Sequence, residues 1–176
     1  MIVRRESPAD IDAVHEVTAA AFAKPDRLGE APAEETLLRE LRGCDGWMPG
    51  LSLVAIGADG EVAGHVLGSR AHIAGTPVVA VGPVSVRPGH QRRGVGLALL
   101  HTLLGAADAM GEPMAVLLGS PAYYSRFGFR PATEYGVVPP VPEWEPFFQV
   151  RVLSAYDPDD PRLHGTFAYA EPFNHV

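Results

Sequence analysis

The chain has little cysteine and no long apolar run. Its 176 residues include one cysteine, Cys44, which excludes an internal disulfide framework and a zinc site built on cysteines. No apolar run reaches the length of a membrane-spanning helix, and residues 1–5 lack the apolar core of a signal peptide. We therefore expect a cytoplasmic protein without a membrane partner.

Basic residues are also in deficit. The chain has 14 lysines and arginines against 21 aspartates and glutamates, which gives a formal net charge of −7. Nucleic-acid binders usually carry a basic footprint, so we expect no nucleic-acid partner. An acidic surface suits a cationic substrate, although solubility alone also explains it. The histidines are scattered over different expected elements without metal-ligand spacing, so we expect no metal site.

What the chain does contain is an alternation of strand and helix patterns without a repeat. Its length and its 47% of hydrophobic residues suit one well-buried core, so we expect a single domain over residues 1–176. The patterns predict strands at 2–4, 51–56, 62–66, 78–86 and 113–118, and helices at 7–22, 34–42, 97–111 and 121–127. Strand-like runs at 147–153 and 166–170 follow in a proline-rich segment.

The most informative segment is the turn at residues 91–96, Gln-Arg-Arg-Gly-Val-Gly, between an apolar strand and a leucine-rich helix. Unpaired N–H groups and a partial positive charge make a helix N-terminus a binding site for anions. No lysine follows Gly94 or Gly96 as a P-loop requires, and Leu99 takes the place of the third glycine of a dinucleotide fingerprint. The turn therefore predicts a phosphate or pyrophosphate site that matches neither of these two nucleotide-binding motifs.

Two blocks resemble motifs of the GNAT N-acetyltransferase superfamily. Residues 84–96, Val-Ser-Val-Arg-Pro-Gly-His-Gln-Arg-Arg-Gly-Val-Gly, are similar to its acyl-CoA-binding motif, and residues 122–129, Ala-Tyr-Tyr-Ser-Arg-Phe-Gly-Phe, to its Tyr-x-x-x-Gly-Phe helix. The resemblance covers about residues 1–155 and extends to the YhbS-like group of bacterial acetyltransferases. It implies an α/β GNAT fold, with a mixed, mostly antiparallel sheet that is flanked by helices and splayed at the CoA-binding strand. A family-variable region follows from about residue 130.

The resemblance implies acetyl-CoA as the cosubstrate. Glycines in the turn leave room for a pyrophosphate at backbone N–H groups, and the glutamine and arginines before them supply donors and positive charge. Backbone groups of residues 84–86 are implied to pair with the pantetheine arm. The expected cofactor-binding residues are Val84, Ser85, Val86, Gln91, Arg92, Arg93, Gly94, Val95 and Gly96.

The register of the second motif makes Tyr124, four residues before Gly128, the expected general acid. A thiol titrates near ~8.5 and a tyrosine near ~10, so the tyrosine can give a proton to the departing CoA thiolate. The backbone N–H of Val86 is expected to stabilise the thioester oxygen. Tyr123 is expected to point elsewhere, into the core or the acceptor cleft.

No single residue can be assigned as the general base. Ala80 stands where some family members have a glutamate. The candidates for a relay through water are Ser85, His65, His72, Glu34 and Glu35, each with a structural role as the alternative. The aromatic residues Trp144, Phe147, Phe148 and Tyr169 either line an acceptor pocket or pack in the core.

Together these features predict an acetyl-CoA-dependent N-acetyltransferase that acts on a primary amine, carried by a small molecule. Two alternatives stay open. One is acetylation of protein lysines or N-termini, and the other is an acyl-CoA-binding module without turnover, which the missing base would suit. The oligomeric state, including a homodimer, also stays open.

Overall fold

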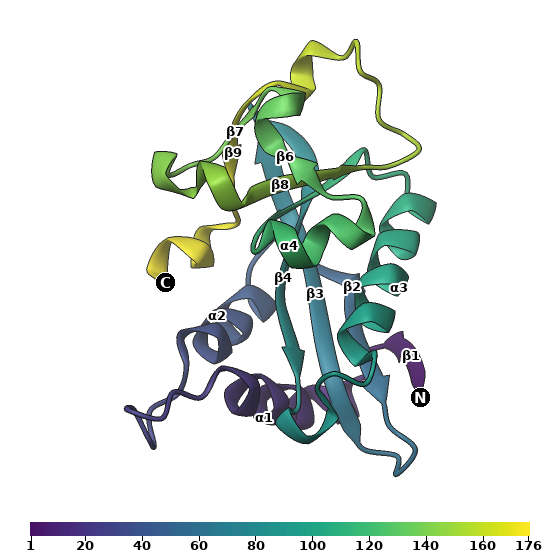
Figure 1. Ribbon diagram of the computed structural model, residues 1–176, viewed down its shortest axis with the longest axis vertical. Helices are drawn as coiled ribbons and strands as arrows, with labels where there is room; N and C mark the ends of the chain where they lie inside the picture. The colour runs from purple at the N-terminus through teal and green to yellow at the C-terminus, as the bar shows by residue number, and fades with distance from the viewer.

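A long mixed sheet runs through the computed structural model, which describes residues 1–176 (Figure 1). Its strand order is β1-β2-β3-β4-β5-β8-β6. The antiparallel part consists of β1 (Ile2–Arg5), β2 (Trp47–Ile56), β3 (Val62–Ile73) and β4 (Thr76–Val86). β5 (Met114–Leu118) runs parallel to β4, and the sheet ends with β8 (Phe148–Val152) and β6 (Arg130–Pro131). β9 (Gly165–Ala168) pairs with β3 and with the short β7 (Val137–Val138).

Helices cover both faces of this sheet (Figure 1). Side chains alternate along a strand, so Leu53 and Ala55 of β2 pack with α3 (Val95–Ala109), while Val54 packs with α1 (Ile11–Phe22) and α2 (Ala33–Arg42). The short α4 (Pro121–Tyr124) lies on the α3 side, where Tyr124 packs against the same core. None of these helices is both long enough and apolar enough to span a membrane.

The mixed, mostly antiparallel sheet predicted from the sequence is confirmed, and the differences lie at element ends. β3 continues to Ile73, whereas the sequence pattern indicated an end at Val66. The hairpin into β4 turns at Ala74 and Gly75, with φ of 47° and 83°, a pair that lacks the usual Asn-Gly signal. The helix expected at 121–127 ends as a 3-10 turn, and the two-residue strands β6 and β7 were not predicted.

β4 and β5 separate after two residue pairs, Val79–Ala115 and Ala80–Val116. β4 itself continues to Val86. Its ladder with β3 shifts register at this level, where Gly82 has a φ of 137°. The last residues of β4 therefore have one edge free of strand pairing, which confirms the predicted splay.

Candidate active site

The free edge of β4 presents backbone groups to the gap beside it. The N–H of Arg87 donates to the carbonyl of Ala63 at 2.8 Å, so the adjacent Val86 directs its own N–H and C=O away from β3. The side-chain amide of Gln91 reaches the Val86 carbonyl from that side, at 3.1 Å. The backbone N–H groups of Val84 and Val86 thus face the gap as unpaired donors.

The N-terminus of α3 opens onto the same gap. Gly94 precedes the helix in the left-handed conformation, with φ 81°, and no side chain caps the first turn. A Cβ at Gly94 would have no protein atom within 4 Å, whereas one at Gly96 would lie 3.2 Å from the Tyr123 hydroxyl. The first-turn N–H groups therefore face open space with a partial positive charge.

These elements border a cavity of about 620 Å³, called here the first cavity. It is lined by Ala21, Phe22, Val84, Val86, Gln91, Arg92, Gly94, Val95, Gly96, Leu97, Tyr123, Tyr124 and Arg126. The structure thus brings together all but two of the residues expected to bind the cofactor. Arg93 is exposed outside the lining, and the Ser85 hydroxyl points under α1 and donates to Thr18 Oγ1 at 3.1 Å.

Tyr123 and Arg126 are among the lining residues of the first cavity that were not assigned to it from the sequence. Tyr123 lines this cavity with its hydroxyl near Gly96, while its ring packs against the core around α3 as expected; it does not line the adjoining second cavity. The guanidinium carbon of Arg126 stands 4.7 Å from the centre of the Tyr123 ring. Tyr123 and Arg126 are three residues apart and so lie on one face of a helix, and this spacing could have indicated from the sequence that they are neighbours.

Tyr124 stands where the first cavity meets a second one of about 420 Å³. The two cavities share Phe22, Val84 and Tyr124 as lining residues. Burial, with the neighbouring Tyr123, raises the pKa of Tyr124 above its usual value, so the hydroxyl keeps its proton at neutral pH. Tyr124 therefore places a protonated hydroxyl at the junction of the two cavities.

Gly119, at the end of β5, lies directly behind the Tyr124 ring. A Cβ at this position would be 2.4 Å from Tyr124 Cε2 and 2.8 Å from Cδ2, closer than folded proteins allow. The ring is held from other sides by Tyr123 and Phe129, at centroid distances of 4.9 Å and 6.0 Å. The position of Tyr124 thus depends on a glycine that no motif had indicated.

Of the acids and histidines considered as proton relays, Glu34 is the one that the structure brings into the second cavity. Glu35 is buried with His15 and Arg39, at 2.9 Å and 2.6 Å from its Oε1. His72 is exposed on β3 opposite β9. Ala80 is fully buried and pairs with β5, so β4 supplies no carboxylate here.

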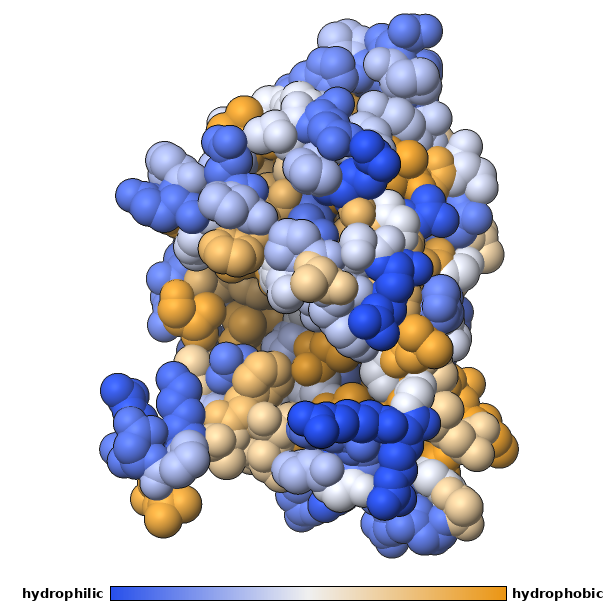
Figure 2. All heavy atoms as spheres, in the orientation of Figure 1, coloured by the Kyte–Doolittle hydropathy of each residue, from blue (hydrophilic) through white to orange (hydrophobic).

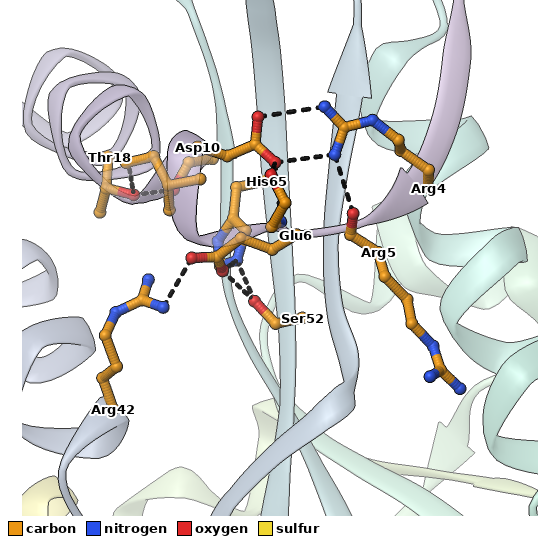
Figure 3. A network of polar contacts seen from close by, with 11 residues as sticks. Arg4, Arg5, Glu6, Asp10, Thr18, Arg42, Ser52 and His65 are labelled. Atoms are coloured by element: carbon orange, nitrogen blue, oxygen red, sulfur yellow. Dashed lines mark hydrogen bonds and ion pairs between the residues drawn. The ribbon is translucent and has the colours of Figure 1, made fainter.

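His65 belongs to a buried polar network instead of a cavity (Figure 3). Its Nε2 lies 2.8 Å from Ser52 Oγ, and the Ser52 hydroxyl donates to Glu6. Because the Ser52 hydroxyl gives its only proton to Glu6, Ser52 Oγ accepts a hydrogen bond from His65, and Nε2 of His65 therefore carries a proton. Arg42 binds the other Glu6 oxygen at 2.6 Å. This network connects the segment just after β1 to α2, β2 and β3.

The aromatic residues of the C-terminal segment divide between cavity, core and surface. Trp144 and Tyr169 line the second cavity, together with Phe173, which was not predicted. Phe148 is fully buried in the core, and Phe147 is 51% exposed. Tyr169 packs between Trp144 and Phe173, at ring distances of 6.4 Å and 4.3 Å.

Comparison with known proteins identifies the family of this fold and site. Residues 3–132 match the model of the acetyltransferase (GNAT) domain. The chain belongs to the GNAT family and is an acyltransferase. The uncharacterised N-acetyltransferase YhbS of Escherichia coli (strain K12) is 32% identical over 177 residues, which cover 99% of this chain and 98% of that protein.

Two solved structures agree with this assignment. The crystal structure of E. coli YhbS in complex with CoA has a TM-score of 0.82 and 29% identity, and covers 98% of this chain and 91% of that one. A GNAT-family acetyltransferase from Brucella melitensis, solved with acetyl-CoA, has a TM-score of 0.76 and 32% identity. The match covers 98% of this chain and 97% of the Brucella chain. Both relatives therefore share the fold over nearly the whole chain.

Proposed function

We propose that this protein transfers the acetyl group of acetyl-CoA to the primary amine of a small molecule. The observation that carries the proposal is the meeting of two cavities at Tyr124, one beside a helix N-terminus and a free strand edge. The relatives that were solved with CoA and acetyl-CoA support the choice of cosubstrate. The second cavity then takes the amine.

In this proposal the first cavity holds the cofactor along two elements. The N–H groups at the start of α3 face the pyrophosphate, with Gln91, Arg92 and Arg126 adding donors or positive charge. The free edge of β4 pairs with the pantetheine arm, which lies where the next strand would otherwise continue. The unpaired N–H of Val86 then faces the thioester carbonyl and stabilises the charge that develops on its oxygen.

The chemical step needs the amine in its neutral form. The amine nitrogen attacks the thioester carbon, a carbon–nitrogen bond forms, and the carbon–sulfur bond breaks. Tyr124 gives its proton to the departing sulfur and regains the proton that the attacking nitrogen releases. Neutral amine and acetyl-CoA thus yield the amide and free CoA thiol, with no net change in protons.

Calorimetry with acetyl-CoA tests the cofactor part of the proposal. We expect Gly96→Val to weaken binding by about tenfold or more, because its side chain would fill space between α3, Tyr123 and Val86. Gly105→Val is the matched control, since Gly105 lies on the exposed side of the same helix with open space around it. Absence of acetyl-CoA binding in the wild type, or equal effects of the two substitutions, contradicts the proposed cofactor site.

Gly119→Ala tests the placement of Tyr124. The added methyl group overlaps the Tyr124 ring, so the ring must move from the junction of the cavities. We expect kcat to fall at least about tenfold, because small displacements of a catalytic group are costly, while the dissociation constant for acetyl-CoA changes little. Steady-state thiol release together with calorimetry measures both values. A variant with wild-type kcat shows that the observed ring position is not the catalytic one.

A further inference from the structure

We propose that the acceptor is a cationic primary amine with an aromatic or bulky apolar body and no carboxylate. This inference rests on the proposed function and specifies the substrate class of the same site. Its basis is the lining of the second cavity, which combines an apolar surface with one acidic side chain. Figure 2 shows a hollow between α4, α2 and the C-terminal segment, with orange apolar side chains around it.

The walls of the second cavity are predominantly apolar. Eleven of its 14 lining residues are hydrophobic. One wall is formed by the stacked rings of Tyr169 and Phe173, with Trp144 edge-on to Tyr169. Burial raises the pKa of Tyr169, so this wall carries no charge at neutral pH. An acceptor without an apolar body would leave this surface in contact with water and gain little from binding.

Glu34 is the charged side chain of this cavity. It lies in the first turn of α2, partly exposed, and has no hydrogen-bond or ion-pair partner within the protein. Glu35, the next residue, is by contrast held by His15 and Arg39. An amine is protonated in water at neutral pH, so the Glu34 carboxylate attracts the form in which the acceptor arrives. A carboxylate on the acceptor would meet the same negative charge and be repelled.

The site of reaction places the amine at one end of the cavity. Tyr124 marks the boundary with the cofactor space, while Trp144 and Phe173 line the second cavity alone. An acceptor that directs its nitrogen toward Tyr124 therefore lays its apolar body along the aromatic wall. A volume of about 420 Å³ accommodates a body of the size of one or two aromatic rings.

The inference is tested by thiol release with matched amines. 2-Phenylethylamine has the expected features, phenylalanine adds a carboxylate, and ethanolamine and spermidine lack the apolar body. We expect kcat/KM for 2-phenylethylamine to exceed that for ethanolamine and spermidine by about 10- to 100-fold, the effect of burying one phenyl group. It should also exceed kcat/KM for phenylalanine, because the carboxylate of phenylalanine meets the negative charge of Glu34. Equal or faster turnover of spermidine, ethanolamine, phenylalanine or a lysine-containing peptide overturns it.

Glu34→Gln separates the role of the charge from that of shape. We expect KM for 2-phenylethylamine to rise about five- to tenfold with little change in kcat, since a cation loses an ionic partner. Glu61→Gln, which removes an exposed charge on the β2–β3 hairpin, is the control and should keep the wild-type KM. An unchanged KM in Glu34→Gln overturns the assignment of Glu34.

The same measurements distinguish this inference from the proposed function. If acetyl-CoA binds and polar amines are acetylated best, the substrate class is wrong and the acetyltransfer reaction stands. If acetyl-CoA binds but no amine, peptide or polyamine releases thiol, the proposed reaction itself fails. Trp144→Ala provides a second variant at the far wall, for which we expect a loss with 2-phenylethylamine and none with ethanolamine.

Discussion

Replacing Tyr124 by phenylalanine is expected to lower kcat about a hundredfold, the usual size of a general-acid contribution. The ring fills the same space in both proteins, and the Tyr124 hydroxyl has no hydrogen-bond partner within the protein, so folding and the shape of both cavities should be preserved. What disappears is the proton that the departing sulfur receives in the proposed reaction. The dissociation constant for acetyl-CoA should stay within about twofold, because uniform binding is not affected.

Single-turnover thiol release with saturating acetyl-CoA and amine measures this effect without a contribution from product release. Tyr156→Phe is the control, because Tyr156 packs on the edge of the C-terminal core and lines neither cavity. The raised pKa of Tyr124 also predicts that activity does not fall through loss of this proton near neutral pH. A Tyr124→Phe variant with wild-type kcat removes Tyr124 from the mechanism.

The proposed cofactor half of the site was accessible from the sequence because it is continuous along the chain. The end of β4, the glycine turn and the start of α3 occupy residues 84–96 without interruption. A local motif therefore states both the residue types and their relative placement. The same holds for Tyr124, which lies on a short helix with its own motif. Fold prediction succeeded for a related reason, since each long element carried its own periodic pattern.

The proposed acceptor half was not accessible in this way. Phe22, Glu34, Trp144 and Phe173 come from the end of α1, the start of α2 and the C-terminal segment. Only tertiary packing brings them to one cavity, so no spacing rule connects them. Glu34 was one of several acids and histidines considered, and what distinguishes it is its position beside the aromatic wall. Gly119 was missed because its role depends on its contact with the Tyr124 ring, which only the folded structure shows.

The relay candidates His65 and Ser85 illustrate a third limit, which is strand register. They pair across β3 and β4 and share the face beneath α1, because the register shift near Gly82 sets which side chains face the helices. A change of one residue in register would have turned them to the opposite face. The sequence contains no signal for that bulge beyond a glycine and a proline. Their role follows from the structure as that of buried polar groups.

Glu6→Gln is expected to lower the free energy of unfolding at pH 7 by about 3 kcal/mol, the lower end of the effect of breaking a buried ion pair. The Glu6 side chain is 4% exposed and bonds to Arg42 and Ser52. Glutamine has nearly the same volume, so little of the loss comes from packing. Arg42 would keep its charge over Trp47 without the partner carboxylate.

The pH dependence gives this prediction a second readout. Burial alone raises the pKa of Glu6, but contacts with His65, Arg42 and Ser52 outweigh it and lower the pKa from 4.5 to about 2. The Glu6 carboxyl therefore holds its proton less tightly in the folded state than in the unfolded state. The ionised carboxylate stabilises the folded state, and this stabilisation is fully present above pH 4.5. It is lost as the pH falls from 4.5 toward 2, and a shift of this size corresponds to about 3 kcal/mol.

Urea denaturation at pH 7, 5 and 3 measures the expected convergence. The free energy of unfolding of the wild type should exceed that of Glu6→Gln by a similar amount at pH 7 and 5. The difference should be clearly smaller at pH 3, because the Glu6 carboxyl is then mostly protonated in the unfolded state but still ionised in the folded state. Glu61→Gln should follow the wild type within about 0.5 kcal/mol at each pH, as surface substitutions do. A gap between wild type and Glu6→Gln that is the same at all three pH values contradicts a linked titration of Glu6. Because the network lies away from both cavities, the folded variant should still bind acetyl-CoA, which separates its role in stability from the reaction at Tyr124.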